Sequence, residues 1–179
     1  MIEQPRIRAA THLDADALAA LGERTFRDTF AADNSVEDIE AYVAHAFSVD
    51  RIAAELAGSE NRYLVAFLDG DAQPAGYVKL RTGTAHASVT GPAPIELQRL
   101  YADRQALGCG VGAALMHAAL RTAASAGHQT LWLGVWERNA RAIAFYQRWH
   151  FEKVGEHVFR LGSDDQTDWI LARRLSGID

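Results

Sequence analysis

Cysteine is nearly absent from this chain of 179 residues, and long apolar runs are missing altogether. The single thiol, Cys109, can form no internal disulfide, so nothing indicates an oxidising compartment. No stretch approaches the roughly 20 apolar residues that a transmembrane helix needs. Glu3 and Pro5 stand where a signal peptide would carry its apolar stretch. These absences predict a cytoplasmic protein that does not enter a membrane.

Positive charge is also scarce, because 23 acidic residues outnumber 18 lysines and arginines and leave a formal net charge of -5. This balance argues against a nucleic-acid partner, whose phosphates bind basic surfaces. It is compatible with a cationic substrate, although solubility alone favours a charge of this size. The seven histidines show no metal-ligand spacing, so we expect no metal site.

The chain has the length and composition of one globular domain, which we expect to span residues 1–179. After a short strand at 6–9, apolar residues recur at helical spacing over 13–26. Ser35, with Asp38 three residues later, predicts the start of a second helix that runs to about Phe47. A third helix over 50–57 is expected to end at Gly58 in a left-handed conformation.

The rest of the chain alternates extended and helical patterns. Strands are predicted at 62–68 and 75–81, as an antiparallel hairpin, and at 95–102, 130–135, 151–161 and 168–172. Helices are predicted at 110–126 and 139–149, and a turn at 162–165. The unit from 95 to 135 predicts a parallel, right-handed crossover. Together these patterns predict an α+β or mixed α/β domain.

The most informative segment is a glycine-rich stretch between the strand at 95–102 and the long helix that follows. It reads Gln105-Ala106-Leu107-Gly108-Cys109-Gly110-Val111-Gly112. Alternate glycines let the backbone turn tightly and leave its amides bare. The helix start adds unpaired N–H groups and the positive end of the helix dipole. The segment therefore has the features of a phosphate or pyrophosphate site.

Three interpretations of this segment stay open on the residues alone. The first is a tight turn without a ligand. The second is a dinucleotide site, because Gly108-x-Gly110-x-x-Ala113 satisfies the Rossmann expression and Glu137 would supply its acid. That fingerprint opens directly off a strand in a repeated βαβ fold, whereas residues 102–107 intervene here and one crossover unit is predicted. The third interpretation is an acetyl-CoA site.

A resemblance to the GNAT acetyltransferases favours the third interpretation. Gln105-x-x-Gly108-x-Gly110 resembles their (Arg/Gln)-x-x-Gly-x-(Gly/Ala) motif, placed between the fourth strand and the third major helix. The strand at 130–135 and the segments 137–142 and 144–151 resemble the family in order and spacing. Segments 155–162 and 164–168 look closest to bacterial polyamine (spermidine/spermine) acetyltransferases. The resemblance implies a GNAT fold, with a mixed sheet of about seven strands whose fourth and fifth strands splay apart.

The resemblance also implies how acetyl-CoA would be held. Main-chain groups near Leu100 and Tyr101 would bind the pantetheine arm, and one N–H would polarise the thioester carbonyl. Asn139 would contact the arm as well as cap its own helix. The amides of the glycine loop would bind the pyrophosphate, with Cys109 as a small space-filling residue. The implied cofactor-binding residues are Leu100, Tyr101, Gln105, Leu107, Gly108, Cys109, Gly110, Val111, Gly112 and Asn139.

Two side chains are implied in catalysis. Tyr146 stands where the family tyrosine protonates the leaving thiolate. A phenol titrates near pH ~10 and a thiol near ~8.5, so the phenol is still protonated when the thiolate departs. Glu96 stands where a glutamate accepts the amine's proton in related polyamine acetyltransferases. Without a catalytic role, Tyr146 would be an aromatic residue of the core and Glu96 a glutamate at the surface. His150 departs from the family, which usually has a glycine there as a left-handed helix stop.

The acceptor side is implied on the two early helices, with Phe26, Thr29 and Phe30 as substrate-binding residues. Acidic residues around them suit a small-molecule amine, or form a solvated helix face. The implied function is direct transfer of an acetyl group from acetyl-CoA to a primary amine, such as a polyamine, in a ternary complex. The alternatives are a protein, peptide or amino-sugar acceptor, or a non-catalytic acyl-CoA-binding module. Homodimers are common in the family, and no pattern here shows one.

Overall fold

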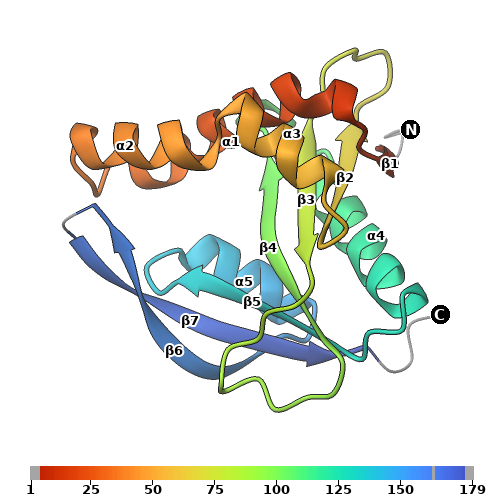
Figure 1. The fold of residues 1–179 in the computed structure, drawn as a ribbon, viewed down its shortest axis with the longest axis vertical. Coiled ribbons are helices and arrows are strands. Elements are labelled where there is room, and N and C mark those ends of the chain that lie inside the picture. The colour runs from red at the N-terminus through yellow and green to blue at the C-terminus, as the bar shows by residue number, and fades with distance from the viewer. Residues whose placement is uncertain (1–4, 163, 176–179) are drawn as a thin grey trace.

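A computed structural model describes residues 5–162 and 164–175 and places a mixed sheet at the centre of the molecule (Figure 1). Within that part of the chain the sheet has seven strands in the order β1-β2-β3-β4-β5-β7-β6. Neighbouring strands are antiparallel except β4 and β5, which are parallel. The strands are β1 (Arg6–Ala9), β2 (Asn61–Phe67), β3 (Gly76–Arg81), β4 (Pro94–Ala102), β5 (Thr130–Trp136), β6 (Glu152–Leu161) and β7 (Asp164–Arg174).

Five α-helices flank this sheet in the described residues. They are α1 (Ala15–Phe30), α2 (Val36–Ala46), α3 (Val49–Ala57), α4 (Val111–Ser125) and α5 (Ala140–Arg148). Two short 3₁₀ turns, η1 (His12–Asp14) and η2 (Arg104–Ala106), precede α1 and α4. Among the residues that the structure describes, no helix is both long and apolar enough to span a bilayer. The mixed α/β fold predicted from the sequence is confirmed.

The predicted start of α2 agrees with the structure, whereas the predicted end of α3 does not. The Ser35 hydroxyl accepts a hydrogen bond from the Asp38 N–H at 3.1 Å, which confirms the predicted cap of α2. The prediction for Gly58 is wrong, because its φ of -80° and ψ of 143° are extended rather than left-handed. Its N–H still bonds the last carbonyls of α3, and the extended conformation directs the chain towards β2.

The largest difference from the predicted strands is the length of the β6–β7 hairpin. β7 was expected over 168–172 but extends from Asp164, where it pairs with Leu161 at the tip of β6. Gly162 makes the turn with a φ of 60°, and Ser163 lies outside the described residues. The added residues, Asp164 to Thr167, are all polar, although Gln166 is buried. The apolar alternation that marks a half-buried strand is therefore missing from the start of β7.

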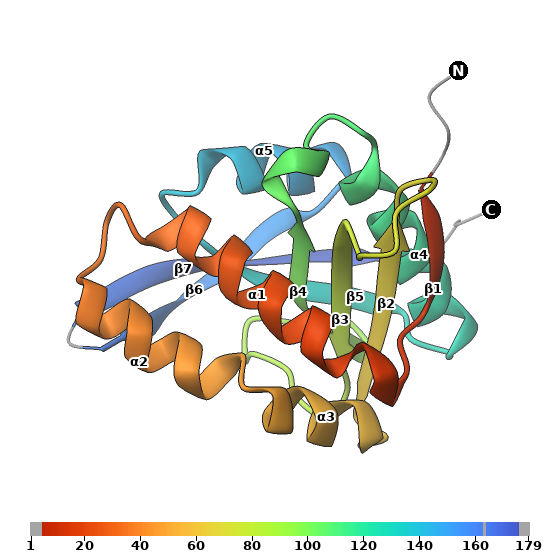
Figure 2. The same cartoon turned by 90° about the horizontal axis from the view of Figure 1, so that it is seen from above.

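Two hydrophobic layers cover opposite faces of the sheet. Val78 and Leu80 on β3 pack with α4 in the larger core, whereas Tyr77, the residue before Val78, packs with α1 and α3. Successive residues of a strand point to opposite faces, so α4 lies on one side and α1 to α3 on the other. Figure 2 shows α1 crossing over the strands, with α4 on the far side.

A buried ion pair ties the early helices to the sheet. The Lys79 ammonium on β3 lies 2.7 Å from the Glu55 carboxylate on α3, and Lys79 is only 2 % exposed. Burial lowers the pKa of Lys79 to about 8, although hydrogen bonding to Glu55 opposes that shift. The pair fixes α3, and through it the helical layer, against the centre of the sheet.

The two central strands separate part of the way along. Parallel pairing of β4 with β5 runs from Pro94 to Glu96 and stops at the pair Glu96 and Trp132. On its other side β4 stays paired with β3 as far as Ala102. The register there shifts between Lys79 and Leu80, which marks a β-bulge at Gln98. The predicted splay of the fourth and fifth strands is thus present.

Candidate active site

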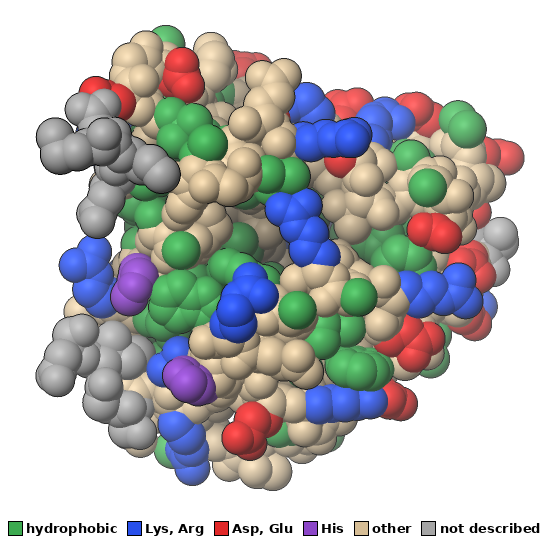
Figure 3. Space-filling model, turned by 180° about the vertical axis from the view of Figure 1, so that it is seen from behind, with side chains coloured by type: hydrophobic (Ala, Val, Ile, Leu, Met, Phe, Trp, Pro, Cys, Tyr) green, Lys and Arg blue, Asp and Glu red, His purple; other side chains and the backbone are tan. Residues whose placement is uncertain are grey.

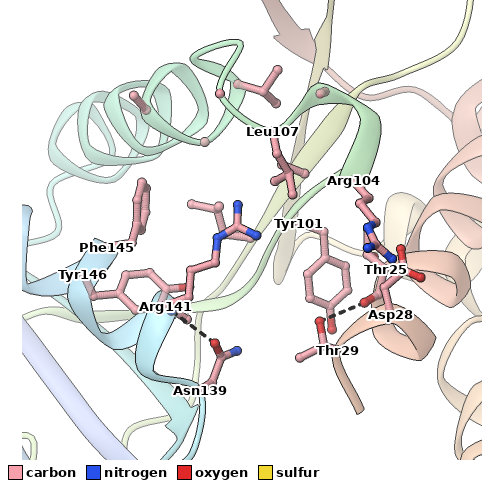
Figure 4. Close-up of a pocket in the computed structure, with 18 of the residues that line it drawn as sticks. Thr25, Asp28, Thr29, Tyr101, Arg104, Leu107, Asn139, Arg141, Phe145 and Tyr146 are labelled. Atoms are coloured by element: carbon pink, nitrogen blue, oxygen red, sulfur yellow. Dashed lines mark hydrogen bonds between the residues drawn. The ribbon is translucent and has the colours of Figure 1, made fainter. Parts of the chain in front are cut away.

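A cleft of about 870 Å³ opens where β4 and β5 separate. Its walls come from α1, the end of β4, the 104–113 loop, the end of β5 and α5. Figure 4 shows Thr25, Asp28 and Thr29 of α1 on one side, facing Phe145 and Tyr146 of α5 across Tyr101. Segments far apart in the sequence therefore meet at the parting of the sheet.

The glycine loop forms the base of this cleft with its backbone. Gly108 and Gly110 have φ values of 85° and 77°, the left-handed region that glycine adopts without strain. No heavy atom lies within 4 Å of where a Cβ would stand on either residue. Gly110 caps α4 without any side-chain hydrogen bond. The first N–H groups of α4 are therefore available to an anion, as the sequence predicted.

Arginines also line this cleft, although the sequence prediction of the cofactor site did not include them. Arg141 and Arg148 come from α5, Arg138 from the turn just before its N-cap Asn139, and Arg104 from η2. Positions 141, 145 and 148 fall on one helical face, so a search for charge at helical spacing would have found the two arginines of α5. Figure 4 shows Arg141 extending into the cleft, and Figure 3 shows Lys and Arg side chains around a hollow. The cleft suits a ligand carrying several phosphates.

The register of β3 and β4 decides which main-chain groups face the gap. The Asp103 N–H bonds the Ala75 carbonyl on the β3 side at 2.8 Å. In an antiparallel pair, every second residue of a strand directs its N–H and C=O groups to the partner strand. Tyr101, two residues before Asp103, therefore also bonds towards β3. Leu100 and Ala102 then direct their N–H and C=O groups towards β5. Leu100 thus presents its main chain to the cleft, whereas Tyr101 lines the cleft with its ring.

Tyr146 and Asn139 are brought to the opposite wall by α5. The Asn139 side chain accepts a hydrogen bond from the Ala142 N–H at 3.1 Å, which is an N-cap. Tyr146 is 8 % exposed and packs edge-on against Phe145 and Phe151. Burial raises the pKa of Tyr146 above its ordinary range. Its phenol is therefore protonated at neutral pH.

The predicted acceptor-side residues take different positions. Thr29 lines the cleft. Phe30 packs against Trp136 at the end of β5, with 5.4 Å between ring centroids, and Phe26 is buried in the α1–α2 layer. Asp28 and Asp33 line the cleft as well, which the sequence had suggested only as part of an acidic region. An acidic α1 wall therefore faces the arginines of α5.

Besides Phe26 and Phe30, three predicted site residues are not among those that line the cleft: Glu96, Gln105 and Cys109. The Glu96 carboxylate accepts hydrogen bonds from Arg81 at 2.8 Å and Thr84 at 3.4 Å on the neighbouring β3 and its loop. Gln105 is exposed outside the cleft, and Cys109 packs against the core beneath the loop. The carboxylate of Glu96 is thus occupied by an ion pair with Arg81 and lies outside the cleft, so its predicted role as general base stays a prediction.

Among residues 5–162 and 164–175 no group of three or more His, Cys, Asp or Glu side chains could hold a metal ion.

An open mixed sheet whose two central strands separate beside a glycine loop is a fold of acetyltransferases. The chain matches the Acetyltransferase (GNAT) family over residues 24–151, and it belongs to that family. An uncharacterized N-acetyltransferase from the pepI 3' region of Lactobacillus delbrueckii subsp. lactis is 33% identical over 95% of this chain and 97% of that protein. An uncharacterized N-acetyltransferase of Mycobacterium tuberculosis (strain H37Rv) is 36% identical over 90% and 98%, respectively.

Solved structures share the fold at lower identity. PaiA N-acetyltransferase from Thermoplasma acidophilum, solved in complex with coenzyme A, is 21% identical with a TM-score of 0.75, over 96% of this chain and 99% of that one. The ribosomal-protein-S18-alanine N-acetyltransferase from Escherichia coli is 19% identical with a TM-score of 0.69, over 97% and 95%. The names of the sequence relatives give no acceptor, so they do not support the closer likeness to polyamine acetyltransferases.

His150 follows α5 in the left-handed region, with a φ of 60°. Replacing it with glycine removes the clash of its Cβ, worth about 1–2 kcal/mol, against about 0.4–1 kcal/mol of added freedom in the unfolded chain. We expect His150→Gly to raise the free energy of unfolding by about 0.5–1 kcal/mol in urea denaturation. His150→Ala keeps the Cβ and should bring no gain; a gain of equal size in both variants would contradict the strain at this position.

Proposed function

We propose that this protein transfers the acetyl group of acetyl-CoA to a primary amine by direct attack in a ternary complex. The observation that carries the proposal is the cleft at the parted strands, where bare loop amides and Tyr146 face one another. Membership of the GNAT family and the coenzyme A bound to the Thermoplasma acidophilum enzyme support it.

The residues of the cleft fit the donor. The amides of residues 107–112 and the arginines of α5 would hold its phosphates, and the main chain of Leu100 and Ala102 its pantetheine arm. Asn139 would add a side-chain contact. Acetyl-CoA supplies an activated acyl group as a thioester. A gap-facing N–H of β4 would stabilise the charge that develops on the carbonyl oxygen, and Tyr146 would donate its proton to the departing sulfur.

The acceptor would be a cation that approaches along α1. Asp28 and Asp33 line that side, and Thr29 and the Phe30–Trp136 pair lie between them and the sheet. A polyamine has the charge for such a wall. An amino sugar or the amine of a peptide has a single charge and is the alternative within the same chemistry.

Thiol release from acetyl-CoA tests the function directly. The panel is spermidine, spermine, 1,4-diaminobutane, glucosamine and a lysine peptide. We expect release with at least one amine and fastest release with the polyamines. Release with the peptide or the amino sugar alone would replace the polyamine assignment. Tight coenzyme A binding with no release on any amine would instead indicate an acyl-CoA-binding module.

Gly110→Val tests the donor site. A side chain at this position strains the loop and fills the space beside the α4 amides, so we expect the Kd of coenzyme A to rise at least about tenfold by calorimetry. Gly70→Val is the matched control, because Gly70 also has a positive φ and open surroundings but lies in the distant β2–β3 turn. Equal affinities in the two variants would refute the loop assignment.

Tyr146→Phe tests the proton donor. The change keeps the buried ring and removes only the hydroxyl, so kcat should fall by about 10²–10⁴ while the Kd of coenzyme A stays within about twofold. Tyr77→Phe is the control, since Tyr77 is a fully buried tyrosine outside the cleft and its hydroxyl has no partner in the described residues. An unchanged kcat, with chemistry shown to limit the rate, would exclude this role.

A further inference from the structure

An exposed glycine interrupts an otherwise buried strand at the centre of the sheet. Gly134 is the one residue of β5 that is not buried. A Cβ on Gly134 would lie 3.5 Å from Oδ2 of Asp168 and 3.6 Å from Cε1 of His157. We call this exposed position the Gly134 notch; Trp132 and Trp136 flank it along β5, and Asp168 and His157 lie beside it.

Strand register places this notch next to the cleft. Trp136, which lines the cleft, pairs with Asp168 on β7, and Asp168 pairs with His157 on β6. Residues directly opposite each other on neighbouring strands share a face, so these three side chains stand in one row. Phe30 of α1 packs on Trp136, so the row lies on the α1 side of the sheet. This is the side from which the acceptor is proposed to approach.

Three unpartnered polar atoms belong to the same region. Continuing the register of β4 and β5 beyond Glu96 and Trp132 would place Gln98 level with Gly134 across the opened gap. Oε1 of Gln98, Nδ1 of His157 and Nε1 of Trp132 are buried, and none has a hydrogen-bond partner in the described part of the chain. Buried polar atoms are nearly always paired with protein or water, so the Gln98 and His157 atoms are free to accept hydrogen bonds from a bound group. A primary ammonium brings three N–H donors.

Asp168 has the setting of a proton acceptor that Glu96 lacks. No lysine or arginine in the described residues lies within ion-pair distance of Asp168, whereas Glu96 is held by Arg81. Burial raises the pKa of Asp168 to about 6. A carboxylate that is unpaired and partly desolvated is a stronger base than one in an ion pair.

The groups that face Asp168 from its neighbours carry no fixed positive charge. His157 lies beside it from β6, and His86 of the 82–93 loop has its ring centroid 5.8 Å from that of His157. From α2, Tyr42 lies close enough that the charge of Asp168 adds to the burial that raises the pKa of Tyr42. From β5 come only Gly134 and Trp136. Either histidine, when protonated, would oppose the binding of a cation.

We infer that the Gly134 notch binds the ammonium group of the acceptor and that Asp168 is the general base that takes its proton. The inference rests on the proposed acetyl transfer and makes its acceptor site specific. Gln98 and His157 would accept the other N–H groups of the bound amine. The predicted role of Glu96 passes to Asp168, and the Glu96–Arg81 pair then holds β4 at the point where the strands part.

The protons of the proposed reaction balance with these residues. The ammonium gives one proton to Asp168, and the free amine nitrogen forms a bond to the acetyl carbon. The carbon–sulfur bond breaks, and the sulfur takes the proton of Tyr146. The nitrogen loses a second proton as the amide forms, which restores the phenol. Asp168 returns its proton to solvent, so one proton is released for each amine acetylated.

The pH profile of Asp168→Asn tests the inference, with whichever panel amine the wild type acetylates fastest. In the wild type, kcat/KM should rise with an apparent pKa near 6 and then level off. In the variant, kcat/KM should be about 10²–10⁴-fold lower at pH 7 and rise tenfold per pH unit as the amine loses its own proton, near pH ~10. Asp165→Asn, on the same strand but ion-paired with Arg160, should keep the wild-type profile.

Two further measurements test the inference without the pH profile of the reaction. The first is the binding of the amine at the notch. Gly134→Ala adds one methyl group at ordinary contact distances, so the chain folds while the notch is filled. We expect the KM for the amine to rise at least about tenfold and the Kd of coenzyme A to stay unchanged.

The melting temperature is the second readout. The folded-state pKa of Asp168, about 6, lies above its unfolded value near ~3.9, so its contribution to stability falls as the pH rises through this window. Asp168→Asn should therefore melt above the wild type at pH 8, with the difference shrinking towards pH 4.

The outcomes separate the two proposals. A wild type that acetylates no amine overturns the proposed function and this inference together. A wild type that turns over, with an Asp168→Asn profile parallel to its own at every pH, overturns the base alone. A normal amine KM in Gly134→Ala overturns the notch as the acceptor site. Loss of the pH 6 limb in Glu96→Gln, with the limb kept in Asp168→Asn, would return the role to Glu96.

Discussion

Parallel pairing between β4 and β5 lasts from Pro94 to Glu96 and then stops, and the arrangement of the site depends on that interruption. Both strands remain paired on their outer sides, β4 with β3 and β5 with β7, so the sheet stays intact while its middle opens. In a continuous sheet the N–H and C=O groups on the facing edges of β4 and β5 would bond each other; beyond Glu96 they can bond a ligand instead. The opening also connects the α5 side of the sheet with the α1 side, so donor and acceptor can meet inside it.

Local chemistry made part of this site predictable. The glycine loop, the Asn139 cap and the left-handed His150 each depend on residues close in sequence, and the structure has all three. Positions that depend on register were less accessible. Glu96 looked free on its strand, because its partner Arg81 is identified only by the pairing of β3 with β4. Asp168 looked like an ordinary strand residue, since its neighbours come from β5 and β6.

Several site features reduce stability locally. His150 holds a left-handed conformation that suits glycine better, and Asp168 keeps a carboxyl group partly away from water without a counter-ion. Gln98 disrupts the ladder at a bulge. The surrounding cores and the buried Lys79–Glu55 pair hold these positions in place. Strain and unpaired polar groups of this kind are typical of functional sites.

The aspartates of the α1 wall have a consequence for turnover. In the proposed reaction, Asp28 and Asp33 would attract an amine only while its nitrogen is charged, and acetylation would convert that nitrogen to a neutral amide. The attraction that brings the acceptor in would therefore disappear at the moment of reaction, and the product would leave a wall that no longer holds it. An acceptor with further amino groups keeps part of that attraction, so a polyamine would dissociate more slowly after its first acetylation than an amine with a single charge.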